Sequence, residues 1–208
     1  MRLVDLHGQS IGRVEEDRRH GDRDAVKKIA VTGCDRQATR EEVRMAPWLR
    51  ASPEAMRSVM AGMRDTPWSW READVGDLCR RMGWTLQEVV DGSIAIADAG
   101  LEVPGHQVQF LFREGGVDDI RVRLTQSVHD EVTGRDRFIG DAFADAAAEG
   151  VTVLGEPTAR QHTKPPTVRW RLDETSTVLV ENVGSVVTVT WASNRFQDEW
   201  DQVTEAPA

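Results

Sequence analysis

Residues 106–126 read HQVQFLFREGGVDDIRVRLTQ, and this stretch decides the fold class. Polar and apolar residues alternate on both sides of the Gly115-Gly116 pair, a pattern that predicts two strands joined by a tight turn. Successive side chains of a strand point to opposite faces of a sheet, so one face of this hairpin is expected to be apolar and buried. The residues predicted for that buried face are Val108, Phe110, Phe112, Ile120, Val122 and Leu124.

The opposite face of the same hairpin is polar and rich in arginine. Its predicted members are Gln107, Gln109, Arg113, Arg121 and Arg123. Two further arginines, Arg169 and Arg171, alternate in the same phase on a later strand, so we expect them on this solvent-facing side as well. Two interpretations remain open. In the first, acidic residues neutralise the arginines, namely Glu88, Glu181 and acids of the helices. In the second, the face is a docking platform for a protein partner, since arginine is favoured at interfaces.

Further strands and helices follow on both sides of the hairpin. TLQEVV and SIAIAD flank Asp91-Gly92, which is a two-residue hairpin signal. Three later strands are predicted at 167–173, 177–183 and 185–193. Three amphipathic helices are expected, from about 53 to 64, from Asp74 to Gly83, and from about 135 to a stop at Gly150. The turns between strands are short, so neighbouring strands should pair antiparallel.

These elements predict an α+β fold, with an antiparallel sheet of six or seven strands, helices packed on one face and the other face wet. Residues 52–201 should form this domain and 202–208 a flexible tail. Residues 1–50 are expected to be weakly structured, because the run at 12–28 is almost all charge and cannot bury enough apolar area. Trp200 follows the last strand, and we expect it to fold back as a plug.

Composition restricts the cellular setting and the classes of partner. The net charge is −9, with +2 on residues 1–50 and −11 on the rest, which argues against general nucleic-acid binding. The first residues lack a basic head followed by an apolar run, and no apolar stretch is long enough to span a membrane. We therefore expect a cytoplasmic protein with no membrane partner. Cys34 and Cys79 cannot build a disulfide framework, and Cys79 lies on an apolar helix stripe that predicts a core position.

The chemistry-bearing motifs that define common enzymes are missing from the sequence. There is no glycine-rich phosphate loop and no G-x-S-x-G nucleophile elbow, so no catalytic residue, cofactor or metal ligand is predicted. One alternative remains, a metal-dependent hydrolase built on an N-terminal histidine and aspartate cluster. That cluster would comprise His7, His20, Asp22 and Asp24. Arg18, Arg19 and Arg23 lie among these residues and would repel a cation, which favours a solvated charge run instead.

Four short motifs carry a family resemblance. They are W-S-W (68–70), L-G-E-P-T (154–158), V-R-W-R (168–171) and W-x-x-N-x-x-x-x-x-W-D (191–201). The combination resembles an uncharacterised domain family of high-GC Gram-positive bacteria, and the element order resembles the type III secretion chaperone-like fold. Members of such families are often encoded beside polymorphic or type VII-secreted toxins. The resemblance implies a role as an immunity protein or as a chaperone of a secreted partner, and it implies no catalytic residue.

The two implied roles need different surfaces. A chaperone holds an unfolded or helical segment and needs an exposed apolar groove. An immunity protein masks a folded active site and can use a polar, charged surface. The predicted wet face is rich in arginine and glutamine, which favours an immunity protein that binds a toxin from a neighbouring gene. The acidic outer faces of the helices offer a second possible surface.

Overall fold

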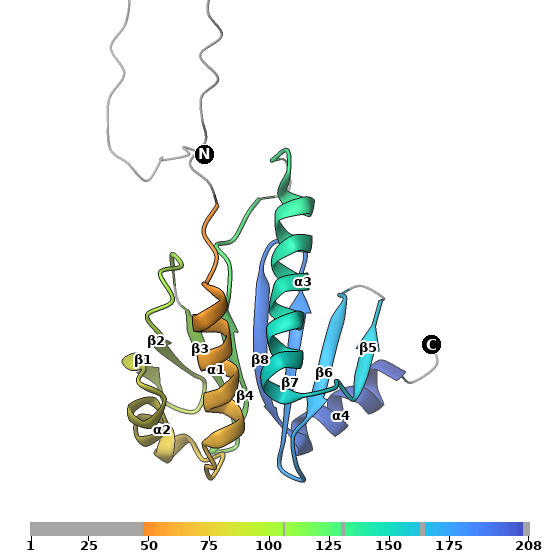
Figure 1. Cartoon of the computed structure of the whole chain (residues 1–208). Coiled ribbons are helices and arrows are strands. Elements are labelled where there is room, and N and C mark those ends of the chain that lie inside the picture. Colours follow the sequence, from red (N-terminus) through yellow and green to blue (C-terminus); the bar gives the residue numbers. More distant parts are fainter. Residues whose placement is uncertain (1–47, 106, 130–131, 163–164, 206–208) are drawn as a thin grey trace, which may run out of the picture. The chain divides into compact units, whose positions relative to one another are not determined.

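The structure is a computed structural model that describes residues 48–105, 107–129, 132–162 and 165–205 (Figure 1). The chain divides into two units, Met1–Arg44 and Met45–Ala208, and every described residue belongs to the second. The predictions for residues 1–50 therefore lie outside the described residues, apart from residues 48–50. The same holds for the whole N-terminal histidine and aspartate cluster.

Eight strands within the described residues form one antiparallel sheet. They are β1 (Thr85–Val90), β2 (Ile94–Asp98), β3 (Val108–Arg113), β4 (Gly116–Arg123), β5 (Ala159–Gln161), β6 (Thr167–Arg171), β7 (Ser176–Asn182) and β8 (Val187–Ser193). Their spatial order is β1-β2-β3-β4-β8-β7-β6-β5, so the N-terminal and C-terminal halves of the sheet meet where β4 pairs with β8. The predicted α+β class and antiparallel pairing are confirmed. The predicted strand count was too low, because β5 is a short, fully exposed strand inside a segment that lacks alternation.

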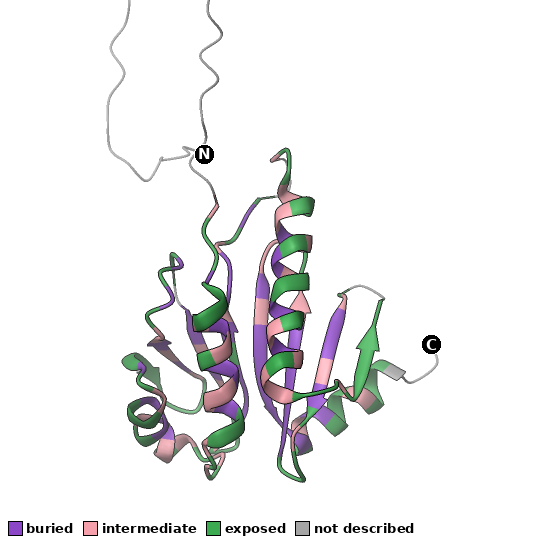
Figure 2. Cartoon of the chain, viewed as in Figure 1, coloured by how far each residue is buried: buried purple, intermediate pink, exposed green. Residues whose placement is uncertain are grey.

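Two helices cover one face of the sheet and close the core (Figures 1 and 2). They are α1 (Pro53–Asp65) and α3 (Arg135–Leu154). The hydroxyl of Ser52 accepts a hydrogen bond from the backbone N–H of Ala55 at 3.2 Å, and this cap begins α1 just before its proline. Five of the six predicted apolar hairpin residues are fully buried, and Phe112 is partly buried. The predicted core face of the hairpin is therefore confirmed.

The tryptophans of the W-S-W motif pack against the sheet. The ring centroid of Trp191 on β8 lies 6.0 Å from that of Trp68 and 5.4 Å from that of Trp70. A short 3-10 helix η1 (Glu72–Asp74) and α2 (Val75–Met82) follow, and Cys79 on α2 is 1% exposed, as predicted. This motif is therefore part of the core packing.

Helix α3 is one turn longer than predicted, because Gly150 lies within it instead of ending it. The ring of Trp170 from β6 packs directly against Gly150, where any side chain would collide with it. The indole N–H of Trp170 also donates to the carbonyl of Gly155 at 2.8 Å. Gly150 thus permits a close approach between helix and sheet. In the sequence alone, a glycine at this position resembles the end of a helix.

A fourth helix, α4 (Asn194–Glu205), follows β8 directly and lies on the other face of the sheet (Figure 1). The expectation that helices cover only one face is therefore wrong, and residues 202–205 are helical instead of part of a tail. Trp200 does not plug the core, since it is 56% exposed. The residues that α4 buries most deeply are polar, with Asn194 and Gln197 each 4% exposed. Its apolar residues Phe196, Trp200 and Val203 are spaced as on one helix face, but Trp200 and Val203 are exposed, so this stripe does not attach the helix to the sheet.

Candidate docking groove

The arginine face is the side of the sheet opposite α1 and α3. It carries Arg113, Arg121, Arg123, Arg169 and Arg171. Arg169 and Arg171 flank Trp170, whose ring points to α3, so their own side chains point the other way. Helix α4 lies across one part of this face and leaves the rest open.

A groove of about 700 Å³ lies between α4 and the open part of the arginine face. Its floor includes Gln107, Gln109, Asp119, Arg121, Arg123, Thr188 and Thr190, and its α4 wall includes Phe196, Gln197, Trp200, Asp201 and Thr204. These floor residues are polar or charged, and the α4 wall presents two aromatic rings. Pro165, Leu179, Val183 and Val186 add apolar side chains to the lining. The rings of Phe196 and Trp200 lie 6.1 Å apart between centroids, so Phe196 supports the exposed indole from its own helix.

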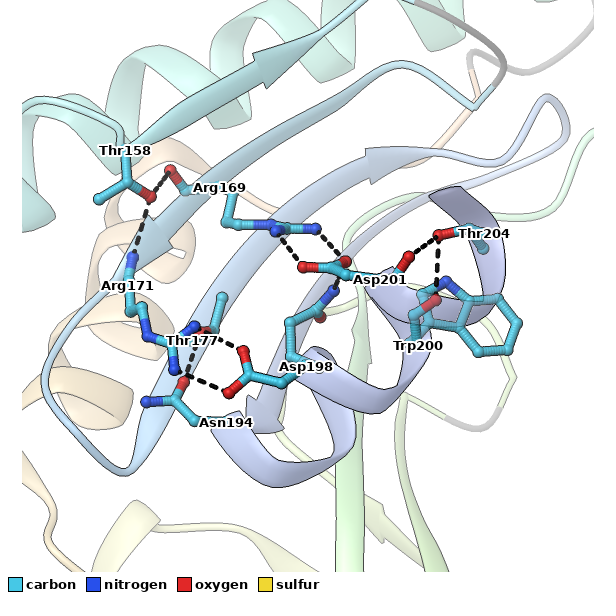
Figure 3. Close-up of polar contacts among 10 residues, drawn as sticks. Thr158, Arg169, Arg171, Thr177, Asn194, Asp198, Trp200, Asp201 and Thr204 are labelled. Atoms are coloured by element: carbon cyan, nitrogen blue, oxygen red, sulfur yellow. Dashed lines mark hydrogen bonds and ion pairs between the residues drawn. The ribbon is translucent and has the colours of Figure 1, made fainter. Parts of the chain in front are cut away.

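Two bidentate ion pairs attach α4 to β6 (Figure 3). Arg169 binds both carboxylate oxygens of Asp201 at 2.7 and 2.9 Å, and both side chains are about three-quarters buried. The amide of Gln197 donates to the same carboxylate at 2.8 Å. Arg171 binds Asp198 at 2.7 and 3.1 Å, and these hydrogen bonds lower the pKa of Asp198. Such paired, charge-assisted bonds fix both distance and orientation.

Arg113 holds the N-terminal half of α4 and a bulge in β4. Its guanidinium lies 2.6 Å from Glu199 and 2.8 Å from Asp118. The β3–β4 register skips Asp118, since Leu111 pairs with Asp119 and the next residue of β3 pairs with Val117. This bulge puts two acidic side chains in succession on the arginine face.

Asp119 is the buried acid of the groove floor. Its side chain is 1% exposed, and its Oδ2 accepts a bond from Nη2 of Arg121 at 3.0 Å. Its Oδ1 is buried and has no hydrogen-bond partner among the described residues. Burial raises the pKa of Asp119, the guanidinium of Arg121 opposes that rise, and Glu181 and Asp118 add to it. The carboxylate is therefore poorly satisfied and costly to keep ionised.

Arg121 and Arg123 differ from the other arginines of the face, because α4 does not bind them. The Arg121 side chain is 48% exposed, and among the described residues its ion-pair partner is Asp119. Within the described residues the polar contact of Arg123 is a long one, 3.5 Å from Nη1 to the carbonyl of Pro104. Both guanidinium groups thus keep donors that are free to bind a ligand.

Gln107 was predicted as a partner-binding residue, but its amide makes three hydrogen bonds within the chain. Its Oε1 accepts hydrogen bonds from the backbone N–H groups of Ala99 and Leu101, each at 3.0 Å. Its Nε2 donates to the carbonyl of Val103 at 3.1 Å. The side chain is 8% exposed and holds the β2–β3 connection in place. That result argues for a structural role of Gln107.

The structure brings most of the predicted face together, and it adds residues that the sequence analysis did not single out. Gln109, Arg121, Arg123 and Arg169 line the groove with Gln107, whereas Arg113 and Arg171 lie outside its lining. The acids that pair with the arginines come from β4 and from helix α4, so the expected neutralisation by helix residues is found. Within the described residues, no ion pair involves Glu88 or Glu181. Asp198 and Asp201 are spaced three residues apart on α4, and Asp118-Asp119 breaks the alternation of β4. These two patterns were available signals for a helix and a bulge, and the helical spacing of Phe196, Trp200 and Val203 was a further signal for the helix.

Two further findings concern the described part of the chain. No group of three or more His, Cys, Asp or Glu side chains there is arranged to hold a metal ion. None of its helices is both long enough and apolar enough to cross a membrane.

The model of a family of unknown function, DUF6301, matches residues 54–193. This range is more than half of the chain, and the chain belongs to that family. No curated protein and no solved structure matches the chain. The match covers the sheet with α1, α2 and α3 and ends one residue before α4. Helix α4, which supplies one wall of the groove, thus lies beyond the matched range.

Proposed function

We propose that this protein is a non-enzymatic protein-binding module, an immunity protein of the cytoplasm that neutralises a toxin encoded by a neighbouring gene. The observation that carries the proposal is the exposed Trp200 on the groove wall, with the half-exposed Arg121 on the groove floor. Tryptophan and arginine are the residue types most enriched among the energetic centres of protein interfaces.

The composition of the groove supports a folded partner over an unfolded apolar chain. Besides its aromatic wall and the apolar side chains of Pro165, Leu179, Val183 and Val186, the groove is lined by arginine, glutamine, threonine and carboxylate side chains, which select by hydrogen bonds and charge. Trp200 would supply the apolar anchor, since burying an exposed indole releases a large area from water. A polar floor with one aromatic anchor is the arrangement expected where a charged enzyme surface is masked.

A second candidate, a chaperone for a secreted partner, is favoured by one different observation. Strand β1 is an open edge of the sheet, and all six of its residues are exposed. Leu86, Val89 and Val90 are 37%, 45% and 46% exposed. An open, apolar edge strand can bind an extended segment of another chain by adding it to the sheet.

The experiment is a co-purification of the full chain with the product of the neighbouring gene, followed by calorimetry and a growth-rescue assay. We expect Trp200→Ala and Arg121→Gln each to weaken binding by about 30-fold, as hot-spot truncations do, and to abolish rescue. Arg80→Gln is the matched control, because Arg80 is 75% exposed on α2 and does not line the groove. If Val89→Lys on β1 abolishes binding while both groove variants bind normally, the chaperone role replaces the immunity role.

A further inference from the structure

We propose that Arg121 and Arg123 form a carboxylate-binding pair in the groove, that the partner fills it with an acidic segment, and that Asp119 is the internal counter-ion which this segment displaces. The inference rests on the proposed function for its partner, and it adds the partner's chemistry. Its evidence is the set of charges that the arginine face already holds, the position of the two free guanidinium groups, and the burial of Asp119.

Helix α4 shows what the arginine face binds. Three of its carboxylates each take one arginine of the face, through the pairs Arg113–Glu199, Arg169–Asp201 and Arg171–Asp198. At the start of the helix Asn194 adds hydrogen bonds to Thr177 and to the carbonyl of Asp173, so the three ion pairs are the main attachment of the turns that follow. The face is thus built to receive acidic side chains from a neighbouring segment, and α4 occupies only part of it.

Arg121 and Arg123 are the part that α4 leaves open. They lie two residues apart on β4 and point to the same side, so their backbones are about 7 Å apart along the strand. Alternate residues of an extended peptide have that same spacing, so two acidic side chains can bind the two arginines at once. Gln109 and Thr190 are the cross-strand neighbours of Arg121, and they add hydrogen-bonding groups on either side.

Asp119 lies beneath Arg121, so an incoming ligand meets the guanidinium and not the carboxylate. The Arg121 side chain is 48% exposed, whereas that of Asp119 is 1% exposed. A ligand carboxylate therefore competes with Asp119 for Arg121. Asp119 gives way because its burial is only half compensated, with one oxygen bonded and the other without a partner.

The charges around Asp119 make its displacement a proton-linked step. Glu181 faces it from β7 and is bonded to the hydroxyl of Thr190, while Asp118 is held by Arg113 and Arg195. Once Arg121 turns to the ligand, no cation remains at Asp119, and the carboxyl binds a proton from solvent. Binding of the acidic segment thus takes up a proton, and no bond other than hydrogen bonds is made or broken.

The opposite reading, a site for a cationic side chain at Asp119, makes the opposite prediction for one variant. If Asp119 itself bound the ligand, Asp119→Asn would weaken binding. If Asp119 is a competing counter-ion, Asp119→Asn frees Arg121 and tightens the binding of an anion. The sign of this single change separates the two chemistries.

The test uses fluorescence anisotropy of the full chain with a labelled oligoglutamate peptide, and with an oligolysine peptide of the same length. We expect oligoglutamate to bind and the Arg121→Gln/Arg123→Gln variant to bind it about 100-fold less tightly, at tenfold for each lost charge-assisted contact. Asp119→Asn should bind it about tenfold more tightly, and Arg80→Gln should bind as wild type does. Tighter binding of oligolysine, or weaker or unchanged binding of oligoglutamate by a folded Asp119→Asn, overturns the proposal.

A second measurement serves if Asp119→Asn does not fold. A labelled peptide of cysteic acid keeps its sulfonates ionised throughout, so only the protein titrates. The affinity of this peptide is measured for the His106→Gln/His162→Gln variant, so that titration of these two histidines, which adjoin groove residues in the sequence, does not contribute. Affinity should rise as pH falls from about 7 to 5, and a flat profile refutes proton-linked displacement. If the wild-type protein binds the toxin but not oligoglutamate, this inference alone is overturned. If it binds oligoglutamate but not the toxin, the proposed function alone is overturned.

Discussion

Gly150→Ala should destabilise this protein, although the same change in the middle of a helix usually stabilises. A Cβ atom added at Gly150 would lie 2.6, 2.9 and 3.3 Å from three carbons of the six-membered ring of Trp170. Contacts under 3.0 Å require something to move. The ring has little freedom to do so, because it is 1% exposed and its N–H is bound to the carbonyl of Gly155.

The change in the free energy of unfolding caused by Gly150→Ala is the difference between two opposing effects. Forcing one methyl group into a well-packed core costs about 3 kcal/mol at the upper end of measured cases, and this site belongs there because the ring is held. Replacing a helical glycine by alanine stabilises by about 1 kcal/mol. The net loss is therefore about 2 kcal/mol, which lowers the melting temperature of a domain of this size by about 4–8 °C.

Gly140→Ala is the matched control, because Gly140 lies in the same helix and a Cβ there would meet nothing within 4 Å. It should raise the melting temperature by about 2–4 °C, measured by circular dichroism or calorimetry. Trp170→Phe removes ring volume from the clashing side, so Gly150→Ala should cost less in that background than in wild type. Equal shifts for the two glycine variants, or no coupling between Gly150 and Trp170, would refute the packing argument.

Three further predictions concern α4, the buried acid and the buried thiol. Asp201→Asn should weaken the bonds to Arg169 and lower the hydrogen-exchange protection of residues 194–205 by about tenfold, while the sheet stays protected. An equal loss of protection in helix and sheet would contradict a helix that is held separately. The pKa of Asp119 is raised in the folded state from its ordinary value of 3.8, so the folded state binds this proton more tightly and loses stability as pH rises through the raised pKa. Asp119→Asn should therefore have its largest stability advantage over wild type at neutral pH, and urea titrations should show that advantage shrinking as pH falls toward 4. Burial raises the pKa of Cys79 to about 11. Iodoacetamide should therefore not modify this thiol in a folded Cys34→Ser variant at pH 7 but should modify it in urea. Rapid labelling of the folded protein would show instead that α2 opens.

Much of the fold could be predicted because the signals for it are local. Alternation in β3 and β4 identifies the buried face, since neighbouring side chains on a strand must point in opposite directions. The Ser52-Pro53 start of α1 and the turn at Asp91-Gly92 are likewise written within a few residues. Elements without such a local pattern were missed or misplaced. β5 has no apolar side, and Gly150 resembles a helix end until Trp170 is seen against it.

The candidate site was predictable only in part, for the same reason. The sequence by itself determined that the arginines share one face of the sheet, because their spacing and strand phase leave no other choice. Only the tertiary structure decided which arginines are neutralised and by what. Arg169 and Asp201 are separated by 32 residues, and Arg113 and Glu199 by 86, so their pairing depends on where α4 comes to rest. Helix α4 is held to the sheet by these long-range charges and by hydrogen bonds of Asn194, while Trp200 and Val203 of its apolar side lie exposed. The spacing of its residues therefore indicates a helix, but not which face of the sheet the helix covers.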